Sequence, residues 1–152
     1  MSFDNKSLQN LIMGALERIA FLVVEPTDPN VTNDLPPAYA SAKIDFDGFA
    51  MGTVVVSASE GFLLEMASGI LGVEPEDISV EVEGLDALRE ITNILGGEVL
   101  RALGGDDNPS RLSLPEVINS APSTWPTASC LMDAMGELLY VSWYSKAAKK
   151  AA

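Results

Sequence analysis

Residues 39–56 read YASAKIDFDGFAMGTVVV, and this stretch predicts two antiparallel strands joined by a turn. From Tyr39 to Phe46, small and apolar residues alternate with polar ones, which is typical of a strand with one buried face. Asp47-Gly48 favours a tight turn, and the apolar run from Met51 to Val56 supplies a second strand. The segment therefore predicts a β-hairpin.

Helical patterns lie on both sides of this hairpin. Residues 7–24 carry apolar side chains at helical spacing, with Ser7 as the expected cap, and residues 25–37 contain four prolines and are predicted to form a loop. A short helix is expected between Ser59 and Gly72, and a longer one over residues 85–103, ending at Gly104-Gly105. The hairpin is thus expected to pack against helices.

The last third of the chain holds three apolar segments, over residues 112–118, 128–134 and 137–143, and Met135-Gly136 separates the last two as a turn would. The order helix, hairpin, two helices and three strands predicts an α+β fold with helices packed on an antiparallel sheet. We expect a single domain over residues 1–152, with an ordered core from about residue 7 to 145 and a basic tail over residues 146–152.

The composition excludes several classes of function. The 152 residues include 9 Lys and Arg, 22 Asp and Glu, and no His, which gives a formal charge of −13. Such an acidic chain is a poor candidate for binding nucleic acid, and without imidazole it can form neither a His-dependent nucleophile relay nor a His-ligated zinc site. With one cysteine, no signal peptide at Met1-Ser2-Phe3-Asp4 and no membrane-length apolar run, the chain is expected in the cytoplasm.

Each candidate metal or phosphate site lacks residues that such a site requires or has a simpler explanation. Asp45 to Gly48 resembles the start of a calcium loop, but Phe49 and Val56 stand where such a loop needs oxygen ligands. Gly104 to Asp107 is better explained as a helix end and a solvated loop than as a cation site, and Gly96-Gly97 lacks the residues of a phosphate loop. We expect no bound metal or cofactor. Three further residues are expected in the core, or at an interface for the two tryptophans: Cys130, Trp125 and Trp143.

The helix over residues 86–101, DALREITNILGGEVLR, carries the most informative pattern. At about 100° per residue, one face carries the residues that are expected to be buried. These are Leu88, Thr92, Leu95, Val99 and Ala102. Glu90 and Asn93 point outward together, one turn apart, and Gly97 clears the surface beside them. Asp86, Ile94, Gly97 and Arg101 lie on the same outward face and are candidate partner contacts.

Spacing alone does not decide between a site and an ordinary solvated helix face, and the pattern by itself favours the solvated face. Glu116 and Asn119 repeat the same Glu-x-x-Asn spacing. In a strand, however, residues three apart face opposite sides of the sheet, so this second pair cannot act together.

Residues 90–97, EITNILGG, followed after a loop by LSLPEVI at 112–118, resemble the signature of the CheC/CheX/FliY phosphatases of bacterial chemotaxis, particularly the CheX type. The resemblance extends over about residues 7–145. It implies an α+β pseudo-twofold unit. It also implies a homodimer, because CheX proteins pair through their sheets. CheC proteins carry two Glu-x-x-Asn helices, but here neither Glu17 with Ala20 nor Asn10 with Met13 supplies a second pair. At most one site per chain is expected.

The resemblance also implies an activity, namely hydrolysis of the aspartyl phosphate on a CheY-like response regulator. The catalytic pair would be Asn93, which orients the attacking water, and Glu90, which pairs with the regulator's active-site lysine. Mg²⁺ is expected on the regulator rather than on this chain. Two alternatives stay open: a non-catalytic module that binds a regulator or a motor-switch component, and a small-molecule sensor.

Overall fold

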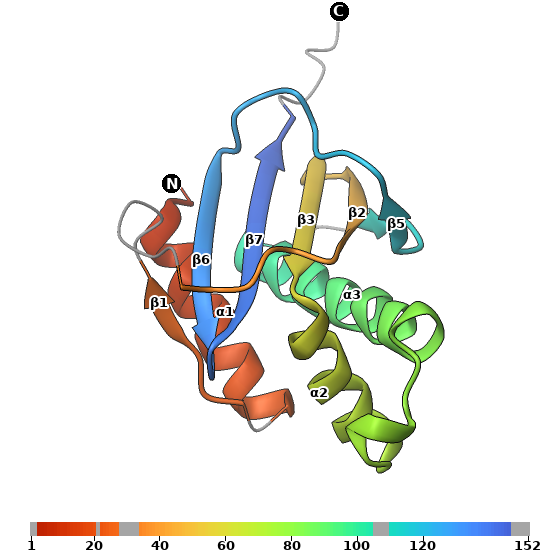
Figure 1. Cartoon of the computed structure of the whole chain (residues 1–152). Helices are drawn as coiled ribbons and strands as arrows, with labels where there is room; N and C mark the ends of the chain where they lie inside the picture. Colours follow the sequence, from red (N-terminus) through yellow and green to blue (C-terminus); the bar gives the residue numbers. More distant parts are fainter. Residues whose placement is uncertain (1–2, 21, 28–33, 105–109, 147–152) are drawn as a thin grey trace, which may run out of the picture.

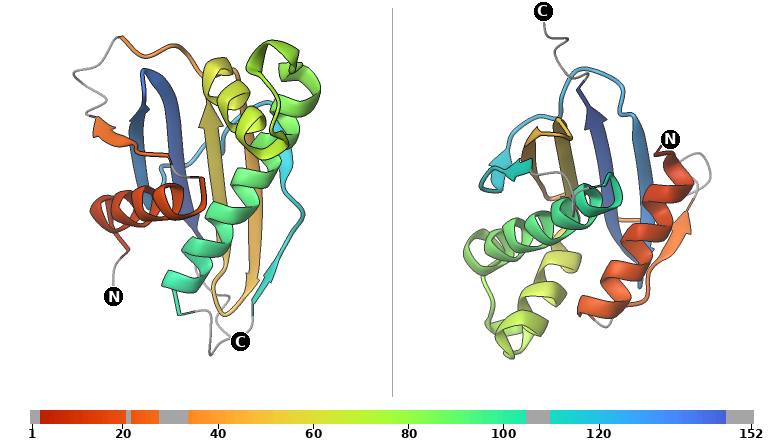
Figure 2. Two further views of the ribbon diagram at one scale, coloured as in Figure 1. Left: turned by 90° about the horizontal axis from the view of Figure 1, so that it is seen from below. Right: turned by 180° about the vertical axis from the view of Figure 1, so that it is seen from behind.

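An antiparallel sheet forms one layer of the molecule and helices cover one of its faces (Figures 1 and 2). The computed structural model describes residues 3–20, 22–27, 34–104 and 110–146. The elements are α1 (Asn5–Ala20), β1 (Glu25–Thr27), β2 (Ala40–Gly48), β3 (Gly52–Ala58), α2 (Glu60–Leu71), a 3₁₀ turn (Pro75–Asp77), a π-helical turn (Val80–Gly84), α3 (Leu85–Ala102), β4 (Ser110–Leu112), β5 (Glu116–Ile118), β6 (Ala128–Ala134) and β7 (Glu137–Ser145). The predicted α+β class is confirmed.

Two hairpins form the centre of the sheet. The strand order is β1-β6-β7-β3-β2-β4, with β5 also paired to β2, so the β2–β3 and β6–β7 hairpins meet where β3 pairs with β7. The first hairpin turn is longer than the predicted tight turn, because Phe46 pairs with Gly52 and residues 47–51 form the connection. The predicted turn at Met135-Gly136 is present, and both residues have the positive φ that such turns require.

The two edges of the sheet differ from the sequence prediction. Glu25–Thr27, expected in a loop, forms the short strand β1 and pairs with β6, where Glu25 lies opposite Asp133. Pro26 is tolerated because an edge strand does not need every N–H in the ladder. Residues 28–33 of the predicted loop lie outside the described residues.

On the other edge, the strand predicted over residues 112–118 is divided into β4 and β5, both paired with β2. Ser113 spans the interruption, since its backbone N–H donates to the carbonyl oxygen of Asp45 and its hydroxyl accepts from the Asp45 N–H. Pro115, which has no N–H to donate, follows this bridge. The segment therefore continues the edge in two pieces.

The two halves of the chain exchange their packing partners in a pseudo-twofold arrangement. Helix α1 precedes the β2–β3 hairpin but packs on β6, and α3 precedes the β6–β7 hairpin but packs on β2. Their edge strands follow the same rule, since β1 pairs with β6 and β4 and β5 pair with β2. Between the two helices, Arg18 of α1 and Glu98 of α3 form an ion pair at 2.7 Å. Each half is therefore completed by the other.

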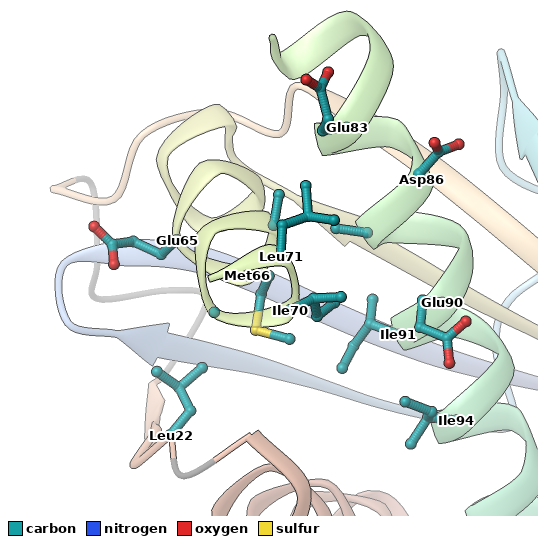
Figure 3. A pocket seen from close by; sticks show the side chains of 13 residues that line it. Leu22, Glu65, Met66, Ile70, Leu71, Glu83, Asp86, Glu90, Ile91 and Ile94 are labelled. Atoms are coloured by element: carbon teal, nitrogen blue, oxygen red, sulfur yellow. The ribbon is translucent and has the colours of Figure 1, made fainter. Parts of the chain in front are cut away.

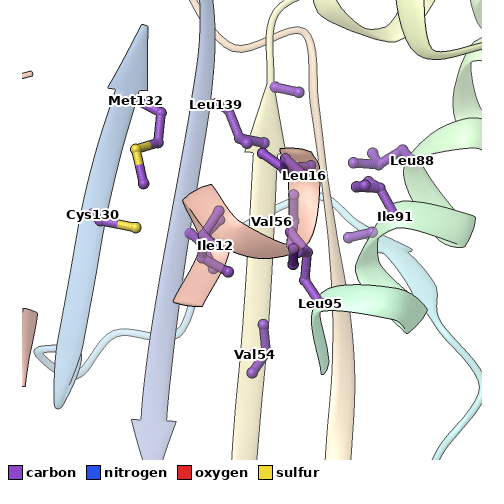
Figure 4. Close-up of a cluster of buried hydrophobic side chains, with 14 of the residues drawn as sticks. Ile12, Leu16, Val54, Val56, Leu88, Ile91, Leu95, Cys130, Met132 and Leu139 are labelled. Carbon is purple, nitrogen blue, oxygen red and sulfur yellow. The ribbon is translucent and has the colours of Figure 1, made fainter. Parts of the chain in front are cut away.

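The core lies between the sheet and the two helices that cross it (Figure 4). Ile12 and Leu16 from α1, Leu88 and Leu95 from α3, and Val54 and Val56 of β3 all belong to this core and are fully buried. Cys130 is buried, as predicted. Of the two tryptophans, Trp143 is buried against Phe46 with ring centroids 5.2 Å apart. Trp125 is 95% exposed in the loop before β6, so it is not a core residue, and its alternative place at an interface stays a prediction.

The helix ends show how local chemistry sets the boundaries. Helix α1 begins earlier than predicted, because Asp4 and not Ser7 is its cap: the Asp4 carboxylate accepts from the Ser7 N–H and the Ser7 hydroxyl, both at 2.8 Å. The bond from the Ser7 N–H lowers the pKa of Asp4. Ser59 precedes α2 as predicted, but its hydroxyl donates to Glu137 instead of capping. Gly72 closes α2 in the left-handed conformation, as predicted.

Close packing of α3 on the sheet depends on Gly96. A Cβ at this position would lie 2.6 Å from Cγ2 of Ile44, a fully buried side chain of β2. At the neighbouring Gly97, a Cβ would meet no heavy atom within 4 Å. Of the two adjacent glycines, only Gly96 is required by packing within the fold.

These two glycines give a matched test of stability. Gly96→Ala is expected to lower the free energy of unfolding by about 1–3 kcal/mol, because overpacking against Ile44 outweighs the better helix propensity of alanine. Gly97→Ala, one residue away, should raise it by up to about 1 kcal/mol. Urea unfolding of both variants measures the difference, and equal stabilities would contradict the close contact.

Candidate functional site

Helix α3, which carries the predicted pair, has one buried face and one exposed face. Leu88, Leu95 and Val99 are fully buried as expected, and so is Thr92, whose hydroxyl donates to the carbonyl oxygen of Leu88 at 2.7 Å. Ala102 was expected on this face but is exposed, because it is the last residue of the helix and extends past the sheet. The buried face fixes the rotation of α3 about its axis.

Glu90 and Asn93 lie on the exposed face of α3, and both side chains are exposed to solvent, as predicted. Residues three apart on a helix are neighbours, so a carboxylate and a carboxamide share one surface there. Gly97 follows one turn after Asn93, and the space that a side chain would occupy is open. The arrangement leaves room for the backbone of another protein to approach the helix.

The other predicted contact residues surround this pair. Asp86 lies in the first turn of α3 and its carboxylate forms an ion pair with Arg89 at 2.9 Å. Arg101, in the last turn, lies 3.3 Å from Glu98, which also binds Arg18. Ile94 is half-buried. Thus the structure places all the predicted site residues along the solvent side of a single helix.

A groove between α2 and α3, which was not predicted from the sequence, adjoins Glu90 (Figure 3). It has a volume of about 720 Å³, and Glu90 and Ile94 line its α3 side. Apolar side chains from both helices and from the segment after α1 form the rest of its wall. These are Leu22, Met66, Ile70, Leu71 and Ile91. The adjacent apolar residues Ile70 and Leu71 in α2 could have indicated an apolar surface. The sequence of one helix does not show, however, which other element lies opposite it.

The second Glu-x-x-Asn copy is placed differently. Glu116 begins β5, and Asn119 follows that strand, with both residues exposed. Because the copy is not helical, its two side chains do not share one face in the way those of α3 do. On α1, the helix related to α3 by the pseudo-twofold arrangement, neither Asn10 nor Glu17 has the partner that such a pair needs. Within the described residues, the helical pair is confined to α3.

No group of three or more acidic or cysteine side chains that could hold a metal ion occurs in the part of the chain that the structure describes. Asp106 and Asp107, from the rejected cation site, lie outside the described residues. Asp45 and Asp47 of the rejected calcium loop lie in β2, where Asp45 accepts from Thr53 at 2.7 Å and binds Lys43 at 3.0 Å. Among the described helices, none is long and apolar enough to cross a membrane.

Comparison with known proteins identifies the family of the chain. The family model for chemotaxis phosphatase CheX matches residues 40–132, which includes the hairpin, α3 and most of β6. The chain belongs to the CheX family. The comparison with curated proteins found no significant match.

Solved CheX structures share the fold of the whole chain. CheX from Desulfovibrio desulfuricans is 19% identical with a TM-score of 0.69, and the match covers 93% of this chain and 97% of that one. CheX from Vibrio vulnificus is 20% identical with a TM-score of 0.68, over 91% and 96% of the two chains. CheX in the CheX–CheY–BeF₃–Mg²⁺ complex from Borrelia burgdorferi is 13% identical with a TM-score of 0.65, over 95% and 99%.

Cys130 offers a test of the sheet that supports α3. Burial raises the pKa of its thiol to about 12, so at pH 8 only about one molecule in ten thousand carries the reactive thiolate. The native protein is expected to react with a thiol reagent at least a hundred times more slowly than the urea-unfolded chain. Mass spectrometry of the labelled protein measures both rates, and rapid labelling without denaturant would contradict the burial of β6.

Proposed function

We propose that this chain is a phosphatase that hydrolyses the aspartyl phosphate of a CheY-like response regulator. Membership of the CheX family supports this class of reaction. The observation that carries the proposal is the pair of exposed side chains, Glu90 and Asn93, on a helix whose buried face is locked against the sheet. A rigid helix can present both groups to another protein without rearrangement.

The reaction asks little chemistry of the phosphatase. Water attacks the phosphorus atom in line, the bond from phosphorus to the aspartyl oxygen breaks, and the products are inorganic phosphate and the free carboxylate. Because the transition state is loose, catalysis depends mainly on positioning the water and on neutralising the phosphoryl oxygens. The neutralising Mg²⁺ is expected on the regulator, so the scheme requires no metal or cofactor on this chain.

Asn93 is assigned the role of positioning the attacking water. Its carboxamide can accept a hydrogen bond from the water and donate another, and it carries no charge. A carboxylate at this position would repel the phosphoryl group, which is itself negative. The exposed side chain at the surface of α3 can enter the active site of a regulator that docks over the helix.

Glu90 is assigned to docking. Its carboxylate would pair with the active-site lysine of the regulator, which fixes the position of the partner and draws the lysine away from the phosphoryl group. Gly97 would allow the regulator's backbone to come close, since no side chain fills the space beside the pair.

Homodimerisation and a cytoplasmic location stay predictions, and so does the absence of a bound cofactor. The alternative is a module on the same fold that binds a regulator or a motor-switch component without hydrolysis. Both functions need an exposed docking face on α3. Only the phosphatase needs the carboxamide of Asn93, so a variant that lacks this side chain distinguishes the two functions.

Asn93→Ala is expected to lower the rate of phosphate release about a hundredfold or more, because the water loses its positioning group. Affinity for the regulator loaded with Mg²⁺ and beryllofluoride should change less than threefold. Release of ³²P-phosphate from a panel of phosphorylated response regulators measures the first, and calorimetry measures the second. Asn119→Ala, at the other Glu-x-x-Asn copy, is the matched control, and wild-type rates for Asn93→Ala would reject the assignment.

Glu90→Lys is expected to weaken binding instead. A lysine at position 90 would face the regulator's lysine, so the Kd for the beryllofluoride-loaded regulator should rise at least tenfold. Glu116→Lys makes the same change of charge at the exposed second copy and should leave the Kd within twofold. If both variants weaken binding equally, net charge and not a contact of Glu90 explains the effect.

A further inference from the structure

Of the described residues that line the groove between α2 and α3, Glu90 alone is assigned a role in the proposed hydrolysis. Ile70 and Leu71 of α2 are 53% and 54% exposed, and Ile91 and Ile94 of α3 line the opposite wall. Figure 3 shows Ile70 and Ile91 near the middle of this space, between the two helices. Solvent exposure of aliphatic side chains is unfavourable, so a partner that covers such a groove is stabilised by burial of its apolar surface.

The charge around the groove has one sign. Among the described residues, four carboxylates line it, Glu65 from α2, Glu83 from the π-helical turn before α3, and Asp86 and Glu90 from α3, and no lysine or arginine does. Figure 3 shows Glu65 on the α2 side, with the other three along the α3 side. Arg89 pairs with Asp86 on the helix surface, which offsets one of these charges.

Neighbouring residues in the sequence add to the negative charge around the groove. Between Lys43 and Arg89 the chain contains no basic residue. The acidic residues within that interval and after β3 are Glu60, Glu65, Glu74, Glu76, Asp77, Glu81, Glu83 and Asp86. All of them lie on α2, on the first turn of α3 or on the connection between these helices. A second copy of this chain would bring the same negative charge, so it is a poor occupant of the groove.

The groove and the proposed catalytic pair form one continuous surface. Glu90 belongs to both, because it lines the groove and lies one turn from Asn93. At about 100° per residue, Ile91 and Ile94 lie on one side of Glu90 and Asn93 lies on the other. A regulator that contacts Glu90 would therefore lie at the edge of the groove.

From this geometry we propose that the α2–α3 groove binds a surface of the response regulator that carries lysine or arginine side chains around an exposed aliphatic side chain. The proposal rests on the proposed function. The groove proposal adds that α2, which does not carry the Glu-x-x-Asn pair, contributes to the choice of partner. The aliphatic side chain covers Ile70 and Leu71, and the cations face Glu65 and Glu83. Complementary charge raises the association rate, and apolar contact slows dissociation.

Two variants on α2 test the groove without touching α3. Ile70→Glu places a charge on its apolar wall, and Glu65→Lys reverses a charge at its rim. Both positions are exposed, so the fold is expected to tolerate the changes. Trp125→Glu and Glu25→Lys are matched controls at exposed sites away from the groove. Thermal unfolding verifies that each variant is folded.

Calorimetry with the regulator loaded with Mg²⁺ and beryllofluoride measures the Kd at two salt concentrations. Ile70→Glu and Glu65→Lys should each raise the Kd at least tenfold, while kcat at saturating regulator stays within threefold of the wild-type value. Glu65→Lys should also make the Kd less sensitive to salt. The controls should stay within twofold. An unchanged Kd for both groove variants would overturn the proposal.

The same measurements separate the groove from the hydrolysis. If Asn93→Ala abolishes phosphate release but the groove variants bind normally, the proposed function stands and the groove proposal is wrong. If a regulator binds through the groove and no phosphate is released, the docking surface stands and the phosphatase is wrong. If the groove variants change the dimerisation constant in sedimentation instead of the Kd for regulator, a second copy occupies the groove and the proposal is overturned.

Discussion

The close approach of α3 to β2, at Gly96 over Ile44, is the constraint on which the rest of the site depends. With hydrogen as its side chain, Gly96 lets the helix lie directly on the sheet, and the buried residues on either side of it then fix the rotation of the helix. Once that rotation is fixed, Glu90 and Asn93 must face solvent. A wider separation would leave a void above Ile44, and α3 would no longer have one preferred orientation. The position of the exposed pair is therefore set from the buried side of the helix.

The pseudo-twofold arrangement makes the restriction of the pair to α3 informative. Both α1 and α3 cross the sheet on the hairpin of the opposite half, and an ion pair from Arg18 to Glu98 joins them. Yet α1 has no acidic residue one turn from an asparagine on its surface. Helix α3 also has α2 packed beside it. The two halves therefore share a scaffold but not a surface.

Much of the fold could be predicted from the sequence, because its main elements carry strong local signals. Alternation in β2, helical spacing in α3 and the Met135-Gly136 turn each specify a structure within one segment. The errors have a common physical origin in tertiary context. Glu25–Thr27 becomes a strand only because β6 offers an edge, β4 and β5 separate where Ser113 bonds to Asp45, and Trp125 is exposed because its loop does not return to the core. For the same reason the side chains of Glu90 and Asn93 were predicted on the exposed face, whereas the groove beside them, which needs two helices, was not.

The exchange of partners between halves has a consequence for how the polypeptide reaches its native state. The first hairpin cannot bury its apolar face against its own preceding helix, because α1 lies on β6, which is more than 100 positions further along the chain. Contacts so distant in sequence require the chain to lose the entropy of a long loop before any stabilising contact forms. Folding is therefore expected to be slower than that of a simple helical bundle. During synthesis, the first hairpin and α1 cannot complete their packing until β6, β7 and α3 have emerged from the ribosome.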